Sequence, residues 1–158
     1  MRFTKREAEP LFDALEAIAR GLGLALIELT VFRRKGGAQV KLTVYKEGSV
    51  GLADCSRAHN AMAPRLELAF PDGELSMEVS SPGIDRLIKD ASEFAFYKGR
   101  AVKCYRTDIS DWSRGILSET DEERLVLRAK NAATGRDGFD ELVIPYKLIA
   151  KAKLDWEE

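Results

Sequence analysis

In the first eighty positions the spacing of hydrophobic residues is first that of a helix and then that of strands. The same sequence of a helical spacing and a strand spacing then follows a second time. Apolar side chains three and four residues apart across 8–22 predict an amphipathic helix. The runs 24–34 and 38–45 predict two strands, and in the second run apolar and polar residues alternate. A second helix from about Leu52 and a third strand over 74–80 complete the pattern.

This order of elements predicts a small α+β domain in which both helices pack on one face of a three-stranded sheet. Lys35-Gly36-Gly37 predicts a hairpin turn, so the first two strands should be antiparallel. The third strand could lie beside either of them. The segment Thr4-Lys5-Arg6-Glu7 predicts a capping box for the first helix, and Pro10 predicts a kink in it.

The pattern changes after residue 91, where short strands and turns follow a brief aromatic helical turn. The expected strands are 100–106, 112–118, 124–128, 141–144 and 150–155, with a 3₁₀ turn before the last. Five short strands with this spacing predict a small SH3-like or Sm-like β-barrel. We therefore expect an α+β chain with an N-terminal domain at 1–84, a linker at 85–91 and a barrel domain at 92–158.

The charge of the chain is nearly balanced, with 25 Lys and Arg against 26 Asp and Glu and a net charge of −1. A protein that binds RNA mainly through phosphates usually has an excess of basic residues, so only a local basic patch remains open. No apolar run approaches the roughly 20 residues of a membrane helix. The first residues also lack the apolar segment of a signal peptide. We expect a cytoplasmic protein that does not contact a membrane.

Residues that could support catalysis or metal binding are few. Cys55, Cys104 and His59 are the only cysteines and histidine, and no Cys-x-x-Cys pair is present. Cys55 and His59 have helical i, i+4 spacing, but no third orienting group accompanies them. There is no phosphate-binding glycine loop and no Gly-x-Ser-x-Gly elbow. We predict no enzyme, no catalytic residue, no cofactor and no metal.

Two segments are candidate binding sites. Arg33, Arg34 and Lys35 form the only run of three basic residues, at the expected hairpin tip. They could be a solvated turn or a contact with RNA phosphates. The second segment, 81–86, reads Ser-Pro-Gly-Ile-Asp-Arg and predicts a type II turn with Gly83 at positive φ. Arg86 could bind a partner's carboxylate or phosphate, or bond internally to Asp85 or a nearby carbonyl.

The second segment closely resembles the Ser-Pro-Gly-Leu-Asp-Arg-Pro-Leu signature of the bacterial RimP family, with Leu87 where the family usually has proline. Further similarity covers nearly the whole chain. In the second half it is carried by Trp112, Gly115, Leu117, Ile144, Pro145, Tyr146, Ile149, Lys151 and Ala152.

The resemblance implies a non-enzymatic ribosome assembly factor that binds the immature small ribosomal subunit and leaves when the subunit is finished. Its expected partners are ribosomal RNA and a small-subunit ribosomal protein, and we expect a monomer. The candidate partner-binding residues are Arg33, Arg34, Lys35, Ser81, Pro82, Gly83, Asp85 and Arg86. The alternative is a general RNA-binding or RNA-chaperone module, which the lack of positive charge disfavours.

Overall fold

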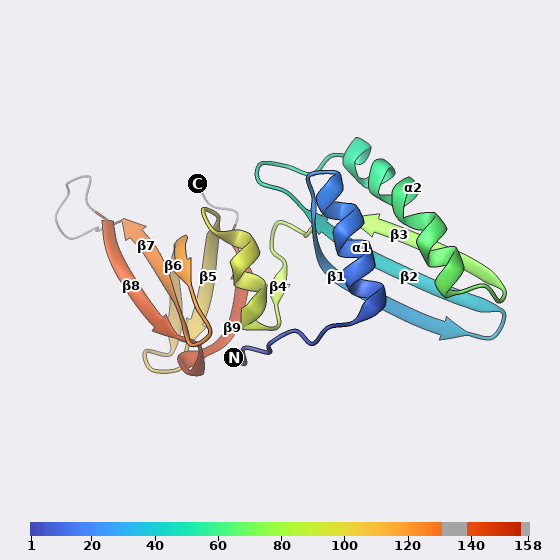
Figure 1. The fold of residues 1–158 in the computed structure, drawn as a ribbon. Helices are drawn as coiled ribbons and strands as arrows, with labels where there is room; N and C mark the ends of the chain where they lie inside the picture. The colour runs from blue at the N-terminus through green and yellow to red at the C-terminus, as the bar shows by residue number, and fades with distance from the viewer. Residues whose placement is uncertain (131–138, 156–158) are drawn as a thin grey trace. The chain divides into compact units, whose positions relative to one another are not determined.

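The computed structural model describes residues 1–130 and 139–155, and the chain forms two compact units (Figure 1). Residues 7–82 form the N-terminal unit. Residues 1–6 and 83–158 form the C-terminal unit. Each unit is described by itself below. None of the helices in the described residues is long and apolar enough to cross a membrane.

The N-terminal unit has the predicted order of elements. They are α1 (Pro10–Gly21), β1 (Ala25–Arg34), β2 (Gly37–Tyr45), α2 (Leu52–Ala69) and β3 (Glu74–Ser80). β1 and β2 are antiparallel, as the hairpin predicts. β3 lies beside β2 and parallel to it, which settles the position that the sequence leaves open. A parallel pair needs a long crossover, and α2 supplies it.

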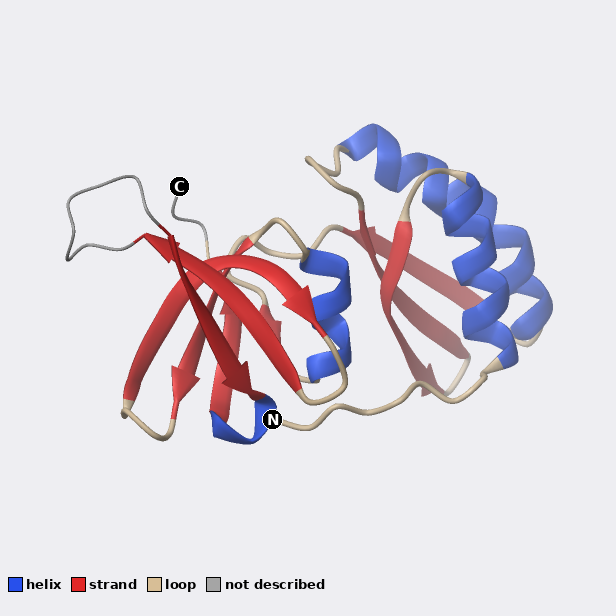
Figure 2. Cartoon of the chain, turned by 60° about the vertical axis from the view of Figure 1, so that its left-hand side comes forward, coloured by secondary structure: helices blue, strands red, loops and turns tan. Residues whose placement is uncertain are grey.

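Both helices cover the same face of this sheet (Figure 2). The core is built from apolar positions with helical spacing on α1 and α2 and with alternating spacing on β1 and β2. The buried apolar residues are Phe12, Leu15, Ala19, Leu24, Leu26, Val40, Leu42, Val44, Ala58, Met62 and Leu66. The two-residue period of β2 therefore sets Val40, Leu42 and Val44 toward the helices and leaves Gln39, Lys41 and Thr43 on the other side of the sheet.

The first helix differs from the prediction at its start. α1 begins at Pro10, which occupies the first helical turn and causes no kink, because a proline there lacks only an N–H that has no helical partner. The predicted capping box at Thr4 is wrong. The Thr4 amide instead donates to Asp90 Oδ1 at 3.0 Å, and the Ala91 amide donates to the Arg2 carbonyl at 2.8 Å. Residues 1–6 therefore belong to the C-terminal unit.

The C-terminal unit contains all five predicted strands. Its elements are β4 (Leu87–Ile88), η1 (Ala91–Tyr97), β5 (Ala101–Arg106), β6 (Asp111–Thr120), β7 (Arg124–Lys130), β8 (Phe139–Pro145), η2 (Tyr146–Leu148) and β9 (Ile149–Leu154). They form an antiparallel sheet in the order β4-β9-β5-β6-β7-β8. Within the described residues β4 and β8 are unpaired with each other, so the predicted closed barrel is not confirmed.

The expected linker at 85–91 has regular structure. Leu87 and Ile88 form β4, which pairs with β9, and Ala91 opens η1. The carboxylate of Asp90 caps η1 by accepting from the Ser92 amide at 3.0 Å. This segment is thus part of the C-terminal unit. The division into independently folding domains at 1–84 and 92–158 stays a prediction.

Candidate functional site

The basic run Arg33-Arg34-Lys35 lies at the end of the β1–β2 hairpin. Arg34 pairs with Gly37, so Lys35 and Gly36 form a two-residue loop. Gly36 has a φ of +93°, which an L side chain rarely adopts, whereas Lys35 does not. A glycine at the third turn position is the requirement of a type II turn. The hairpin tip is therefore a tight loop that presents three cationic side chains in succession.

A second loop, between α2 and β3, holds this tip in place. The Glu74 amide donates to the Gly36 carbonyl at 2.8 Å. Gly73 has a φ of +85°, and a Cβ there would stand 2.2 Å from that same carbonyl oxygen. A Cβ on Gly37 would stand 2.0 Å from the Glu74 carbonyl oxygen. The two backbones can approach this closely only because both positions are glycine.

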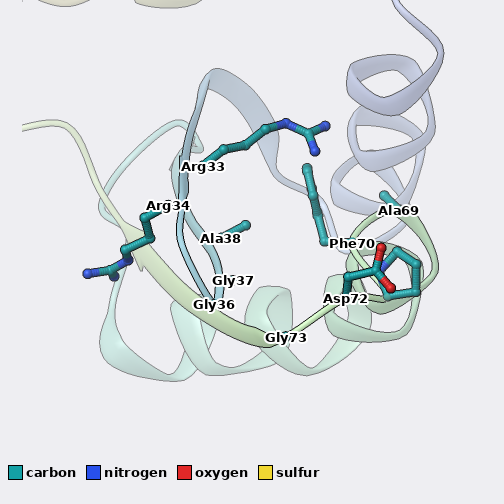
Figure 3. Close-up of a pocket in the computed structure, with 10 residues that line it drawn as sticks. Arg33, Arg34, Gly36, Gly37, Ala38, Ala69, Phe70, Asp72 and Gly73 are labelled. Carbon is teal, nitrogen blue, oxygen red and sulfur yellow. The ribbon is translucent and has the colours of Figure 1, made fainter.

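Where the two loops meet, they line a pocket of about 500 Å³ (Figure 3). The hairpin contributes Arg33, Arg34 and its glycines, and the α2–β3 loop contributes Phe70 and Asp72. The Arg33 guanidinium carbon lies 5.0 Å from the centroid of the Phe70 ring, a cation–π contact. In Figure 3 the Arg33 side chain reaches toward Phe70, and the Arg34 side chain extends away from it.

Strand geometry explains why the two neighbouring arginines diverge. Successive side chains of a strand point to opposite faces, so Arg33 shares the helix-covered face with Val31 while Arg34 occupies the other face. Arg33, Arg34 and Lys35 are all exposed. Within the described part of the chain none of the three forms an ion pair, so their charges are available to an anionic partner.

The segment 81–86 has a different turn from the one predicted. The Arg86 amide donates to the Gly83 carbonyl at 3.1 Å, so the turn spans Gly83 to Arg86 with Ile84 and Asp85 at its centre. Gly83 does not have a positive φ, and a Cβ there would meet only Asp85 Oδ1, at 3.6 Å. The predicted type II turn is therefore wrong. Neither the backbone conformation at this position nor the space around it requires a glycine. Ser81, Gly83 and Asp85 are exposed.

Arg86 is committed to an internal ion pair. Its Nε donates to Glu93 Oε1 at 2.7 Å, and a terminal nitrogen lies 2.6 Å from the same oxygen. The two side chains are only 19% and 10% exposed, and the Arg86 carbonyl accepts from the Leu154 amide at 3.0 Å. Burial, with the charge of Glu93 added, raises the pKa of nearby Tyr97 well above its usual range. Of the two roles that the sequence leaves open for Arg86, the structure shows the internal one, and its partner is Glu93 in place of Asp85 or a carbonyl.

The cysteines lack the features of catalytic nucleophiles. Burial raises the pKa of the half-buried Cys55 thiol, and the Asp54 charge raises it further. Burial raises the pKa of the Cys104 thiol to about 12. A raised pKa leaves less of the reactive thiolate at neutral pH. No group of three or more His, Cys, Asp or Glu that could bind a metal occurs among the described residues.

Comparison with known proteins shows a similarity to one family in both units. Residues 14–85 match the model of the RimP N-terminal domain. The protein named ribosome maturation factor RimP from Borrelia hermsii (strain HS1 / DAH) is 26% identical over 144 residues, which is 91% of this chain and 93% of the relative. The protein of the same name from Borrelia recurrentis (strain A1) is 28% identical over 150 residues, which again is 91% of this chain and 93% of the relative. The chain is similar to the RimP family over nearly its whole length.

Within the RimP signature, the departure at Leu87 falls on an edge strand. Leu87 opens β4, the edge of the six-stranded sheet, and lies opposite Lys153 of β9. An edge strand tolerates proline because one of its sides makes no ladder hydrogen bonds. Leucine and proline can therefore both occupy this position without a change in the order of the strands.

The structure brings only some of the sequence-predicted residues together. Arg33 and Arg34 line one pocket and Lys35 follows them at the hairpin tip, whereas Arg86 belongs to the other unit and is internal. The sequence reasoning missed Phe70 and Asp72 as members of the hairpin site. The Pro71-Asp72-Gly73 turn was visible in the sequence, but its partner depends on the parallel register in which Gly37 lies opposite Glu74.

Proposed function

We propose that this chain is a ribosome maturation factor that binds the immature small ribosomal subunit and catalyses no reaction. The observation that carries the proposal is the similarity to two relatives named ribosome maturation factor RimP, because it spans 91% of the chain and so includes both units. The site of action would be the cytoplasm, and the factor would act as a monomer and leave when the subunit is complete.

The hairpin tip is the proposed contact with ribosomal RNA. Arg33, Arg34 and Lys35 are exposed, and the close approach of Gly36 and Gly73 fixes the loop that presents them. A rigid loop loses little conformational freedom on binding, which favours affinity. Because the whole chain carries a net charge of −1, binding would depend on this local patch rather than on a general attraction to nucleic acid.

The segment 81–86 is the proposed contact with a small-subunit ribosomal protein. Ser81, Gly83 and Asp85 are exposed and could face this partner. Pro82 restricts the backbone at this point, and Arg86 positions the segment through its bond to Glu93. In this proposal Arg86 supports the surface from within and does not itself touch the partner.

An assembly factor can act only by binding one state of the subunit more tightly than another. We propose that residues 1–84 and 92–158 are domains, the second a small SH3-like or Sm-like barrel, and that each contributes one surface. Two linked surfaces raise the effective concentration at the second contact. The factor would therefore bind more tightly to a subunit that contacts both of its surfaces at once than to a subunit that contacts only one.

The test measures binding of the purified chain to immature small subunits as a function of salt. The double variant Arg34→Gln/Lys35→Gln should bind about ten-fold more weakly, and its salt slope should fall by about 1.4, because each lost phosphate contact changes the slope by about 0.7 for single strands. The control Lys98→Gln/Lys151→Gln removes two exposed cations from the C-terminal unit and should bind normally.

Unchanged binding by the hairpin variant would exclude the tip as the RNA contact. Equally tight binding of the unaltered chain to unrelated RNA at physiological salt would contradict a maturation factor and favour an RNA chaperone.

A further inference from the structure

The pocket beside the hairpin tip has one flat apolar wall. Phe70 follows α2 and packs against the core of the N-terminal unit, yet it stays partly exposed toward the pocket. In Figure 3 its ring is seen edge-on, with Arg33 near one end of the ring and the Asp72 loop near the other. Aromatic rings in such a position are the surfaces on which unstacked nucleobases lie.

The pocket also has an asymmetric distribution of charge. Arg33 and Arg34 line the hairpin side, and Asp72 lies at the rim, next to Pro71 in the sequence. Asp72 is exposed, and in the described residues it makes no hydrogen bond or ion pair, so rotation of its side chain toward the pocket breaks no contact. A phosphate would be attracted to the hairpin side and repelled from the rim. A bound nucleotide would therefore have a single favoured orientation.

Asp72 restricts which base would be accepted. An ionised carboxylate can only accept hydrogen bonds, and it can accept two at once. Guanine offers two adjacent N–H donors on its Watson–Crick edge, at N1 and N2, whereas no two adjacent positions on the Watson–Crick edges of adenine, cytosine or uracil are both N–H donors. A carboxylate that faces this edge therefore favours guanine.

We propose that this pocket binds one unpaired guanine nucleotide of RNA, stacked on Phe70 and bonded to Asp72, with its phosphate on the Arg33 guanidinium. The inference deepens the proposed function, on which it rests, by naming the RNA element that the hairpin tip recognises. In the bound state the base displaces the Arg33 guanidinium from the ring. The target is a loop or bulge, because in a duplex the Watson–Crick edge is occupied by the paired strand.

The size and rigidity of the pocket support this reading. A volume of about 500 Å³ lies within the range of small-ligand sites, roughly 300–1,000 Å³. The Gly36–Glu74 hydrogen bond and the close packing of Gly73 fix the two loops relative to each other. Base discrimination requires such fixed walls, because a loose pocket would adapt to any base.

The test follows the amide signals of the full ¹⁵N-labelled chain as nonaribonucleotides are added. The probes are four uridines on each side of a central guanosine, inosine, adenosine or cytidine. The guanosine probe should shift the signals of Gly36, Gly37 and Gly73, and its Kd should be at least about five-fold lower than that of the adenosine probe. Inosine, which lacks the N2 amino group, should fall between them.

Two variants separate the two contacts. Asp72→Asn should abolish the preference for guanosine and leave the other probes unchanged. Phe70→Leu keeps an apolar side chain against the core, and should weaken all four probes by about five-fold or more because the stacking surface is lost. Glu47→Gln removes an exposed carboxylate from the β2–α2 loop and serves as the matched control.

Equal affinity for all four probes, or an unchanged preference in Asp72→Asn, would overturn the inference. So would a glutamate-rich heptapeptide that shifts the same signals with equal affinity, since the pocket would then recognise acidic protein. The proposed function has its own readout in the binding of immature subunits. Normal subunit binding without base preference would reject only the pocket inference, and base preference without subunit binding would reject the proposed function.

Discussion

Replacing Arg86 with alanine should destabilise the chain, because it leaves the buried Glu93 carboxylate without its ionic partner. The two side chains are 19% and 10% exposed, so water can compensate only partly for the lost bonds. Removal of one member of a buried pair costs about 3–5 kcal/mol, and the residual exposure places this pair near the lower value, about 3 kcal/mol. For a chain of this length each kcal/mol lowers the Tm by about 2–4 °C, so a fall of roughly 6–12 °C is expected.

The loss should also depend on pH. Without Arg86 no positive charge offsets the burial of the Glu93 carboxylate, and burial disfavours the charged form, so the variant should be least stable at a pH where free carboxylates are ionised. The deficit relative to the unaltered chain should therefore be smaller at pH 5 than at pH 8. Calorimetry at both values provides the assay. The double variant Arg86→Ala/Glu93→Gln should recover part of the Tm because no buried charge remains.

Arg34→Ala is the matched control for this experiment. Arg34 is exposed and forms no ion pair in the described part of the chain, so its removal should cost less than about 1 kcal/mol. A Tm for Arg86→Ala within about 2 °C of the unaltered chain would correspond to a loss of about 1 kcal/mol or less. That result would show that Glu93 does not depend on Arg86 as its ionic partner. Loss of subunit binding at an unchanged Tm would instead make Arg86 a residue that touches the partner.

Two further predictions concern backbone packing and acid stability. Gly73→Ala should lower the free energy of unfolding in urea by about 1–3 kcal/mol, because the new Cβ would stand 2.2 Å from the Gly36 carbonyl oxygen. The control Gly21→Ala should not destabilise the chain, because the space around its Cβ is open. Burial opposes ionisation of Asp90, but hydrogen bonds from Ser92 and Thr4 outweigh it and lower the pKa to about 2. The stability that Asp90 contributes is thus present above about pH 4 and is lost as the pH falls toward 2. Asp90→Asn should therefore reduce the loss of stability between pH 4 and pH 2. An unchanged loss in this variant would show that Asp90 is not its source.

Features that depend on sequence-local spacing could be predicted. The alternation of Val40, Leu42 and Val44 correctly indicated a half-buried strand, and Lys35-Gly36-Gly37 correctly indicated a hairpin, although Gly37 itself pairs with Arg34 as the first residue of β2. Both follow from the two-residue period of a strand and from the freedom of glycine. The predicted positions of the strands in the second half also follow from this period.

Features that depend on distant partners could not be predicted. Thr4 has the local pattern of a helix cap, but its amide bonds to Asp90, 86 residues away. Arg86 gives no sequence signal for Glu93, because the pairing requires the η1 turn to fold back. The same holds for the pocket, since Phe70 meets Arg33 only once β3 pairs with β2. These residues belong to one site through tertiary pairing and not through spacing.

The central claim is that this chain binds small ribosomal subunits before they are complete. Sedimentation of a cell lysate on a density gradient, with the chain detected in each fraction, tests it most directly. The chain should migrate with free small subunits and be absent from complete ribosomes, and the Arg34→Gln/Lys35→Gln variant should shift toward the top of the gradient. A chain that stays at the top in unaltered form, or that accompanies complete ribosomes equally, would contradict the account.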